Sequence, residues 1–359
     1  MDCFRLRPHR YQTPLVLSNL RNRHMSSSNS RSLLNTRRVT LTGLLTAAGV
    51  LTVLATLVGF AARFWWMFEL AAHFRVQYAL ALAFAALALT LPGWRDRRWA
   101  LVFAFFALVN VVVIAPRFLP AATPSAATGA PTFRALLANV DSDNHDHDRI
   151  HRAIVTADPD FVMLLEVTPR LMARLADLSS RYPHRIAEPS EDHFGIALLS
   201  RWPLHNAAVI RIGPAGLPSI RADLDRGGQR FTLLGTHPPP PIGAEMAQDR
   251  NKQLADLAGL VRQIQQPVLL LGDLNLSPWS PYFTQLLADA DLQDSAAGRG
   301  IQASWPVLWP PLWIPIDHAL YSAGLRIQHR EPGPATGSDH ESVMVDFQIA
   351  GSPVHNLRH

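Results

Sequence analysis

The sequence predicts a layered α/β domain preceded by three transmembrane helices. Three uncharged apolar segments lie in the first third of the chain. After about residue 132, short apolar runs bounded by turn residues recur, with helical patterns between some of them. Strands with covering helices favour a layered α/β sandwich of one domain. The 359 residues are enough for one large domain and an appendage.

The three apolar segments span residues 40–62, 76–92 and 99–115. The first is close to the roughly 20 residues that a helix needs to cross a bilayer, and the other two are near the short end of that range. Tryptophans stand at the segment ends, as they do at membrane interfaces. Three such segments in succession argue against buried core helices and against a cleavable signal peptide.

Positive charges near the segment ends predict the orientation. Eight arginines precede the first segment, whereas the loop at 63–75 carries two and the loop at 93–98 carries three. Because positively charged flanks stay in the cytoplasm, we expect the N-terminus and the second loop inside. The chain then leaves the third helix on the outer side, in the periplasm or the extracellular space.

Composition predicts the domain boundaries. We expect a basic, disordered tail at 1–38, the helices at 39–116, a semi-stiff Pro/Ala/Thr/Gly-rich linker at 117–132, a domain at 133–350 and a tail at 351–359. From residue 132 onward, 19 Lys and Arg face 25 Asp and Glu, which is a net charge of −6. The net charge of +5 for the whole chain therefore reflects membrane topology. The acidic domain weighs against strong duplex binding, which needs a basic surface.

The predicted domain contains eight strands, most of them near-continuous apolar runs of the kind that is buried on both faces. Helices are predicted between some of these strands. The strands are at 133–138, 161–165, 195–199, 219–224, 231–234, 268–271, 318–321 and 342–347. The helices are at 149–157, 168–181 and 245–264, and a further one ends near residue 289.

Polar side chains stand at the ends of these apolar runs. Taken singly, each is more often a turn-former, a helix cap or a solvated residue. Their recurrence, one group at each of several strands, predicts a site at one edge of the fold. The residues are Asn139, Glu166, His237, Asp273, Asn275, Asp317, His318, Asp339 and His340.

These residue types suit phosphate-ester hydrolysis assisted by a hard cation. Glu166, Asn139 and Asp339 can supply the oxygen ligands that Mg²⁺ prefers. Asp273 and Asn275 are two residues apart, so in extended backbone they point to one face and could hold a water and a phosphate together.

Imidazoles complete the predicted site. His340 can stabilise charge or transfer a proton, and Asp317 could fix its tautomer. His237 is expected as a second imidazole near the leaving group. Zinc sites and P-loops are poorly supported, because the sequence has no HExxH, no Cys/His cluster and no GxxxxGK[ST].

Seven stretches together resemble the endonuclease/exonuclease/phosphatase superfamily, in the same order along residues 133–347. They are LLANV, DPDFVMLLEV, GIALLSRWPL, GTHPPPP, LLLGDLNLSPWSP, PIDHALYS and GSDHESV. Membrane helices followed by such a domain are most similar to the bacterial subgroup that includes the teicoplanin-resistance membrane protein. The resemblance implies a DNase-I-like, four-layer α/β/β/α sandwich, here in a bacterial inner or plasma membrane.

The resemblance also implies roles for the metal side. Glu166 matches the Mg²⁺-binding glutamate, and Mn²⁺ is the alternative cation. Asn139 lies near metal and phosphate, and Asp339 matches a metal-side acid. Asp273 matches the acid that orients or deprotonates the attacking water, and Asn275 binds the phosphate.

For the imidazoles, the resemblance implies that His340 is the catalytic histidine with Asp317 as its partner, and that His237 contacts the substrate phosphate. We therefore expect a membrane-anchored, Mg²⁺-dependent phosphoesterase acting at the outer face of the membrane. Its substrate is a phosphate ester, and a lipid-linked one among membrane lipids fits the anchoring. An endo- or exonuclease acting on nucleic acid is the alternative. An inactive membrane scaffold is disfavoured because the motif residues are intact.

Overall fold

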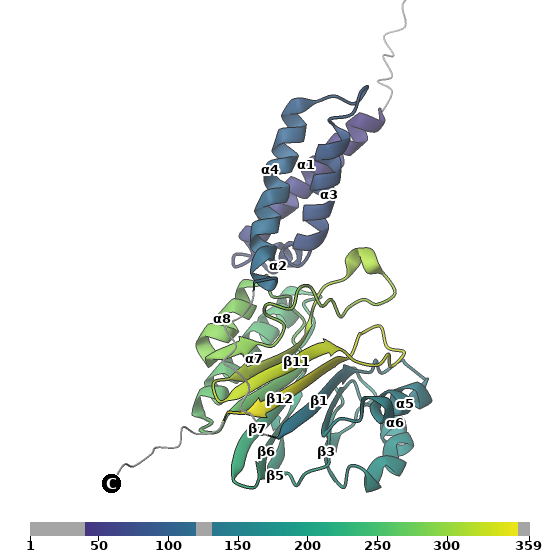
Figure 1. The fold of residues 1–359 in the computed structure, drawn as a ribbon, viewed down its shortest axis with the longest axis vertical. Helices are drawn as coiled ribbons and strands as arrows, with labels where there is room; N and C mark the ends of the chain where they lie inside the picture. Colours follow the sequence, from purple (N-terminus) through teal and green to yellow (C-terminus); the bar gives the residue numbers. More distant parts are fainter. Residues whose placement is uncertain (1–39, 120–130, 351–359) are drawn as a thin grey trace, which may run out of the picture. The chain divides into compact units, whose positions relative to one another are not determined.

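The computed structural model describes residues 40–119 and 131–350 (Figure 1). The tails predicted at 1–38 and 351–359 lie outside the described residues, as does most of the linker predicted at 117–132. The described chain begins with apolar helices and continues into two β-sheets with their covering helices.

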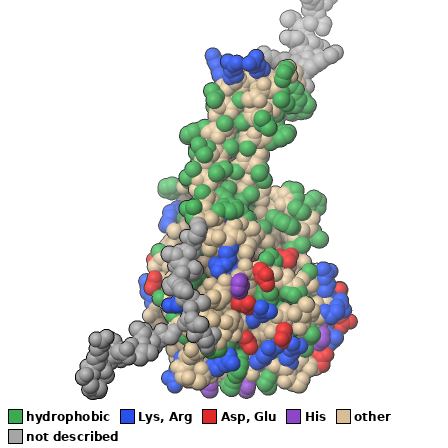
Figure 2. All heavy atoms as spheres, viewed as in Figure 1, with side chains coloured by type: hydrophobic (Ala, Val, Ile, Leu, Met, Phe, Trp, Pro, Cys, Tyr) green, Lys and Arg blue, Asp and Glu red, His purple; other side chains and the backbone are tan. Residues whose placement is uncertain are grey.

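Two helices are candidates for crossing a membrane. α1 (Leu41–Phe60) and α4 (Arg97–Ile114), which η1 (Ala115–Arg117) continues, are long and apolar enough to do so. Asp96 begins α4, because its side chain accepts hydrogen bonds from the backbone N–H groups of Arg98 and Trp99 at 3.2 and 3.4 Å. Figure 2 shows hydrophobic side chains over the surface of this helical part.

The second predicted segment is more complex than a single helix. α3 (Arg75–Ala88) has only 14 residues, and α2 (Trp66–Ala72) precedes it where the sequence predicted a loop. The two are bent by 62° and make a third candidate crossing only if the pair is one broken span. The backbone departs from helical geometry at Phe74 (φ −101°, ψ 30°). The short apolar run around Glu69 therefore forms its own helix instead of joining α3.

Small residues let the apolar helices approach one another. α3 and α4 pack through a buried cluster that includes Ala85, Ala100 and Phe103. A Cβ added at Gly49 of α1 would lie 2.3 Å from the Phe103 ring, so only glycine allows this contact. Close packing over small side chains is the usual way in which helices associate in membranes.

Two six-stranded mixed sheets form the rest of the protein. Each has a parallel pair at its centre, β1 with β2 and β7 with β8, flanked by antiparallel strands. The first sheet, in spatial order, contains β11 (Leu325–Pro332), β12 (Val343–Ile349), β1 (Thr132–Asn139), β2 (Phe161–Leu165), β4 (Ile196–Ser200) and β3 (His184–Glu188). The second contains β5 (His205–Arg211), β6 (Pro218–Arg226), β7 (Gln229–Thr236), β8 (Val268–Asp273), β10 (Asp317–Ser322) and β9 (Leu292–Asp294).

Alternating side chains divide the core into three layers. In β1, Phe133 and Leu137 face the other sheet, whereas Leu136 and Ala138 face helices. Phe133 packs on Phe161, Phe231 and Phe347 with ring centroids 5.5–5.9 Å away. The covering helices are α5 (His147–Ala157), α6 (Pro169–Arg174) and η2 (Leu175–Ser180) on the first sheet, and α7 (Ala244–Gln263) and α8 (Pro281–Ala290) on the second.

The predicted α/β class is confirmed, with two packed sheets between two helical layers. All eight predicted strands are present as β1, β2, β4, β6, β7, β8, β10 and β12, and the predicted helices correspond to α5, α6 with η2, α7 and α8. The strands that the sequence did not predict, β3, β5, β9 and β11, are the edge strands of the two sheets.

Candidate active site

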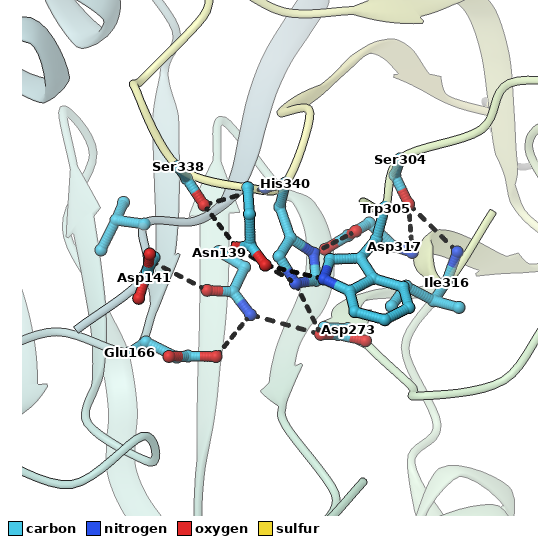
Figure 3. Close-up of polar contacts among 12 residues, drawn as sticks. Asn139, Asp141, Glu166, Asp273, Ser304, Trp305, Ile316, Asp317, Ser338 and His340 are labelled. Atoms are coloured by element: carbon cyan, nitrogen blue, oxygen red, sulfur yellow. Dashed lines mark hydrogen bonds and ion pairs between the residues drawn. The ribbon is translucent and has the colours of Figure 1, made fainter. Parts of the chain in front are cut away.

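The candidate site lies where the central strands of both sheets end. β1 and β8 end at Asn139 and Asp273, and Glu166 and His237 directly follow β2 and β7. The antiparallel neighbours begin at the same edge, since Asp317 of β10 pairs with Asp273. The residues that the sequence placed at strand ends are therefore brought together from both sheets (Figure 3).

Glycine brings β8 close enough to its neighbour to place Asp273. Gly272 pairs with Thr236 of the parallel strand β7. A Cβ at Gly272 would lie 2.3 Å from the Thr236 carbonyl oxygen, so a larger residue would push the two strands apart. The glycine before the acid is thus a packing requirement.

Asn139 links the two sheets within the site. Its amide nitrogen donates to Glu166 Oε1 at 2.8 Å and to Asp273 Oδ2 at 3.2 Å. Its amide oxygen accepts the backbone N–H of Asp141 at 3.1 Å. With this orientation Asn139 holds the two carboxylates at a fixed separation (Figure 3).

An acidic group on one side of Asn139 could hold a metal ion. Asp141, Glu166 and His193 each offer a ligand atom within 4.8 Å of the others. Burial raises the pKa of Asp141, and the negative charges of Asp339 and Glu166 raise it further. Because a bound cation would relieve this repulsion, and because carboxylate oxygens suit hard divalent cations, the donor set fits such an ion.

Two members of this possible metal-binding group, Asp141 and His193, were not predicted from the sequence. Asp141 lies two residues beyond Asn139, and its proximity to that strand end was the available signal. His193 lies on an exposed loop, with Nδ1 3.0 Å from Glu166 Oε2 and 2.7 Å from the Ser142 hydroxyl. Nothing in its local sequence indicates that position.

Asp339 stands between the acidic group and the imidazoles. Its Oδ2 accepts a hydrogen bond from the Trp305 indole N–H at 2.8 Å, and its Oδ1 lies 3.9 Å from His340 Nε2. The charge of Asp339 acts on both Asp141 and His340, raising the pKa of each.

Asp273 lies between two imidazoles. Its Oδ2 is 3.5 Å from His237 Nε2 and 3.7 Å from His340 Nε2. The other ring nitrogen of His340, Nδ1, is 2.8 Å from Asp317 Oδ2. The backbone of Asp317 is fixed in turn, since its N–H donates to Ser304 Oγ at 3.1 Å.

These contacts set the charge of the group. Burial alone would lower the pKa of His340, but Asp317 and Asp273 raise it to about 10. Burial alone would raise the pKa of Asp273, but His237 and His340 lower it to about 2. Burial would also lower the pKa of His237, but Asp273 raises it above its ordinary value. At neutral pH the Asp273 carboxylate therefore lies beside the imidazolium of His340.

The relation between Asp273 and Asn275 differs from the expectation of extended backbone. β8 ends at Asp273, and Asn275 has a left-handed backbone with φ 53°. Its N–H donates to Asp273 Oδ1 at 2.9 Å, and its amide nitrogen donates to the Pro238 carbonyl at 3.0 Å. A turn, and not strand alternation, thus directs both side chains to the same cavity.

Left-handed backbone recurs across the site. Asp141 and Glu166 also have positive φ values, of 59° and 60°. Such conformations are costly for residues other than glycine, and they cluster where a functional geometry is held by its surroundings.

His318, which the sequence also placed in this group, is a core residue. It is buried, its Nε2 lies 2.9 Å from the Leu276 carbonyl, and its ring lies 4.6 Å from that of Phe283. Burial lowers its pKa, so it is a neutral packing residue next to the site.

A cavity of about 730 Å³ opens on these groups. Its polar lining includes the acids, Asn275, His237 and His340. The rest of the lining is mainly apolar and includes residues of α2 and of the segment before α7. The apolar and aromatic lining is Trp66, Leu70, Phe74, Phe194, Pro240, Pro241, Ile242, Met246, Trp305, Ile314 and Ile316.

The two packed mixed sheets define a layered α/β protein. At their common edge it carries acidic residues that could bind a metal ion, next to a pair of imidazoles. Residues 132–340 match the model of the Endonuclease/Exonuclease/phosphatase family, and the chain belongs to that family. No curated protein sequence matches the chain.

Solved structures share the fold at low sequence identity. An endonuclease/exonuclease/phosphatase from Beutenbergia cavernae is 22% identical, with a TM-score of 0.50 over 62% of this chain and 73% of its own. The human Nocturnin catalytic domain with a bound sulfate anion is 22% identical, with a TM-score of 0.51 over 61% and 94%. D. rerio TDP2 in complex with a single-strand DNA product is 17% identical, with a TM-score of 0.50 over 60% and 99%.

The charge state of His340 should depend on Asp317. The Asp317→Asn substitution removes the carboxylate that most raises the pKa of His340, so that pKa should fall well below 10. Because the folded-state pKa lies above the ordinary value of 6.5, protonated His340 stabilises the fold below pH 6.5. That contribution is lost as the pH rises to about 10, and the variant should lose less of it.

NMR titration of histidine ring signals in the EDTA-treated full chain, with His340→Gln to assign the signal, measures this pKa directly. An unchanged pKa of His340 in the Asp317→Asn variant would contradict the assignment.

Proposed function

We propose that the protein is a membrane-anchored, divalent-metal-dependent phosphoesterase that hydrolyses a lipid-linked phosphate ester at the outer face of the membrane. One observation carries this proposal. The cavity joins the acid and imidazole groups to an apolar wall, part of which comes from α2. A phosphate attached to an apolar chain matches both halves of that cavity.

The acidic residues are proposed to hold the cation. Asp141 and Glu166 are the carboxylates best placed for Mg²⁺, with Mn²⁺ as the alternative, and Asp339 is near them. Asn139 keeps Glu166 and Asp273 in register through its two hydrogen bonds. A divalent cation, when bound, would supply positive charge to the phosphate oxygens.

Asp273 is proposed to orient the attacking water. A carboxylate with a pKa of about 2 is a weak base at neutral pH. Its position between two imidazoles suits it to accept a hydrogen bond from water and to aim that water at phosphorus. Asn275 and His237 line the same cavity and are the proposed phosphate contacts.

His340 is proposed to stabilise the negative charge that develops on the phosphate and to donate a proton. Asp317 holds its Nδ1, which leaves Nε2 directed toward Asp273 and the reacting atoms. A preorganised imidazolium in a buried site stabilises such charge more strongly than water does. His237, with its raised pKa, is the proposed partner of the leaving oxygen.

Membrane anchoring is supported by the surface of the helical part. α1 and α4 expose Leu51, Leu101 and Phe105 at 60–72% of their full area. The Leu308 and Trp309 side chains are also exposed, at 78% and 63%. This exposed loop is tied to α3, because Gln77 Nε2 donates to the Trp313 carbonyl at 2.7 Å. The apolar surface therefore continues from the helices onto the phosphoesterase domain.

The alternative is a nuclease. It is favoured by D. rerio TDP2, a fold neighbour in complex with a single-strand DNA product. The net charge of −6 from residue 132 onward opposes it, because nucleic-acid binding depends on positive charge near the phosphates. We therefore rank it second.

Catalysis should depend on a divalent metal and on His340. We expect the detergent-solubilised full chain with Mg²⁺ to release phosphate from lipid phosphates, and EDTA to abolish the activity. His340→Gln should lower kcat about 10²–10⁴-fold, which is the usual contribution of a general acid or base. Rapid cleavage of DNA, with no lipid phosphate hydrolysed, would instead establish the nuclease.

The apolar wall should set the preference for long chains. Ile242 lines the cavity and exposes 76% of its side-chain area. Ile242→Ser should raise KM for a long-chain lipid phosphate and leave KM for a short-chain, water-soluble phosphate unchanged. Val155→Ser, on the exposed part of α5 away from the cavity, is the matched control. Equal KM changes for both substrates would contradict the proposal that this apolar wall binds the lipid chain.

The orientation can be tested separately. A periplasmic reporter enzyme fused after His359 should be active, because the three crossings of the proposed topology place the domain opposite the basic N-terminus. A cytoplasmic reporter at the same position should be inactive. The reverse result would overturn the proposed orientation.

A further inference from the structure

Helix α2 carries a carboxylate that contacts the phosphoesterase domain. Glu69 is fully buried, and its Oε1 accepts a hydrogen bond from the Ser280 hydroxyl at 2.6 Å. Its Oε2 pairs with the guanidinium of Arg250 on α7, which is also fully buried. A membrane-side helix and the catalytic domain thus share a buried ion pair.

Arg250 also contacts the loop that follows Asp273. Its Nη1 donates to the backbone carbonyl of Asn275 at 3.0 Å, while its Nη2 pairs with Glu69. Asn275 is therefore held at three points, namely its N–H, its side-chain amide and its carbonyl. Only the third of these depends on α2.

Asn275 needs such support because of its backbone. With φ at 53°, it occupies the left-handed region, which persists in a residue other than glycine only when neighbouring groups hold it there. A change of this backbone to an ordinary conformation would turn the side-chain amide away from the cavity that it lines.

A second contact ties the same loop to α2. His73, at the end of α2, has its Nδ1 2.9 Å from the Ser277 hydroxyl and accepts the Ser277 backbone N–H at 3.3 Å. The loop that follows Asp273 is thus attached to α2 through Ser277 and Ser280, and through Arg250 at Asn275. On another side, α2 contributes Trp66 and Leu70 to the cavity wall.

Stability alone does not account for this ion pair. Removing two charges from water costs more than their attraction usually returns, and well-packed apolar residues can replace such pairs without loss of stability. An ion pair is required, however, if the Arg250 guanidinium must hold the Asn275 carbonyl while Glu69 balances its charge.

We infer that α2 is a working part of the active site, in which Glu69 and Arg250 are positioning residues that hold Asn275 in its left-handed conformation. This inference rests on the proposed function, because it assigns the pair a role in that reaction. It also means that the catalytic site is incomplete without residues 66–73.

The test uses the full chain in detergent, with p-nitrophenyl phosphate and a lipid phosphate as substrates. The paired variant Glu69→Leu/Arg250→Met removes both charges and leaves neither unpaired. It should unfold at nearly the wild-type temperature, yet its kcat should fall about 10–100-fold. Combined with Asn275→Ala it should be no slower than Asn275→Ala alone, because residues that act as a unit are not additive.

The matched control is Arg117→Met/Asp294→Leu. This pair is also largely buried and joins the helical part to the domain, with the two groups 2.6 Å apart. Its hydrogen bonds do not reach residues 273–280 in the described chain. Its kcat should stay within about twofold of wild type. A folded Glu69→Leu/Arg250→Met variant with wild-type kcat, or a loss that adds fully to that of Asn275→Ala, would overturn the inference.

Hydrogen exchange separates this inference from the proposed function. If the wild-type chain hydrolyses neither substrate, the proposed function fails, but the positioning can still be measured. The Glu69→Leu/Arg250→Met variant should then lose amide protection across residues 273–280, whereas the Arg117→Met/Asp294→Leu variant should not. Unchanged protection of residues 273–280 would overturn the positioning role by itself.

Discussion

The site depends on the parallel pairing of two strands at the centre of each sheet. Parallel neighbours end at the same edge of a sheet. The C-terminal ends of β1 and β2 therefore lie side by side, and so do those of β7 and β8. Face-to-face packing of the sheets, through the cluster that contains Phe133, then sets these two places opposite each other. The hydrogen bonds from Asn139 to Glu166 and Asp273 close the remaining gap between sheets.

Charge is separated along this edge. Acids gather around Asp141, and burial together with the neighbouring charges of Asp339 and Glu166 raises its pKa. A short distance away, imidazoles surround Asp273 and lower its pKa to about 2. The acids around Asp141 favour a cation, and the ring N–H groups of His237 and His340 can donate hydrogen bonds to phosphate oxygens.

Much of this architecture could be predicted from sequence because buried strands are distinctive. The predicted strands are mostly central ones, in which runs such as Phe161–Leu165 are buried on every side chain. The edge strands were missed because their burial is mixed, as in β5, where most side chains are exposed. Likewise, α2 was missed because its role is set by partners that lie about 200 residues away in the chain.

Several residues of the candidate site could be singled out for a related reason, since an apolar run that ends in an acid or amide is visible in a single sequence. Asn139, Glu166 and Asp273 follow this pattern, whereas His340 lies just before the apolar run of β12. His193 and the left-handed turn at Asn275 do not, because a loop position and a backbone angle are set by tertiary contacts. In the sequence, Glu69 is a single charged residue within a short apolar run, and only the structure shows that Arg250 is its partner.

For the proposed lipid-linked substrate, the length of α3 bears on the free energy needed to bring the substrate to the site. Its 14 residues rise about 21 Å, which is less than the roughly 30 Å of a bilayer's hydrocarbon core. If the helical part crosses a membrane as proposed, the bend at Phe74 would place α2, and the cavity wall that it forms, near the depth at which head groups begin. A chain-bearing phosphate could then reach Asp273 while most of its methylenes stay in lipid. Each methylene that is not drawn into water saves about 0.8 kcal/mol of extraction free energy.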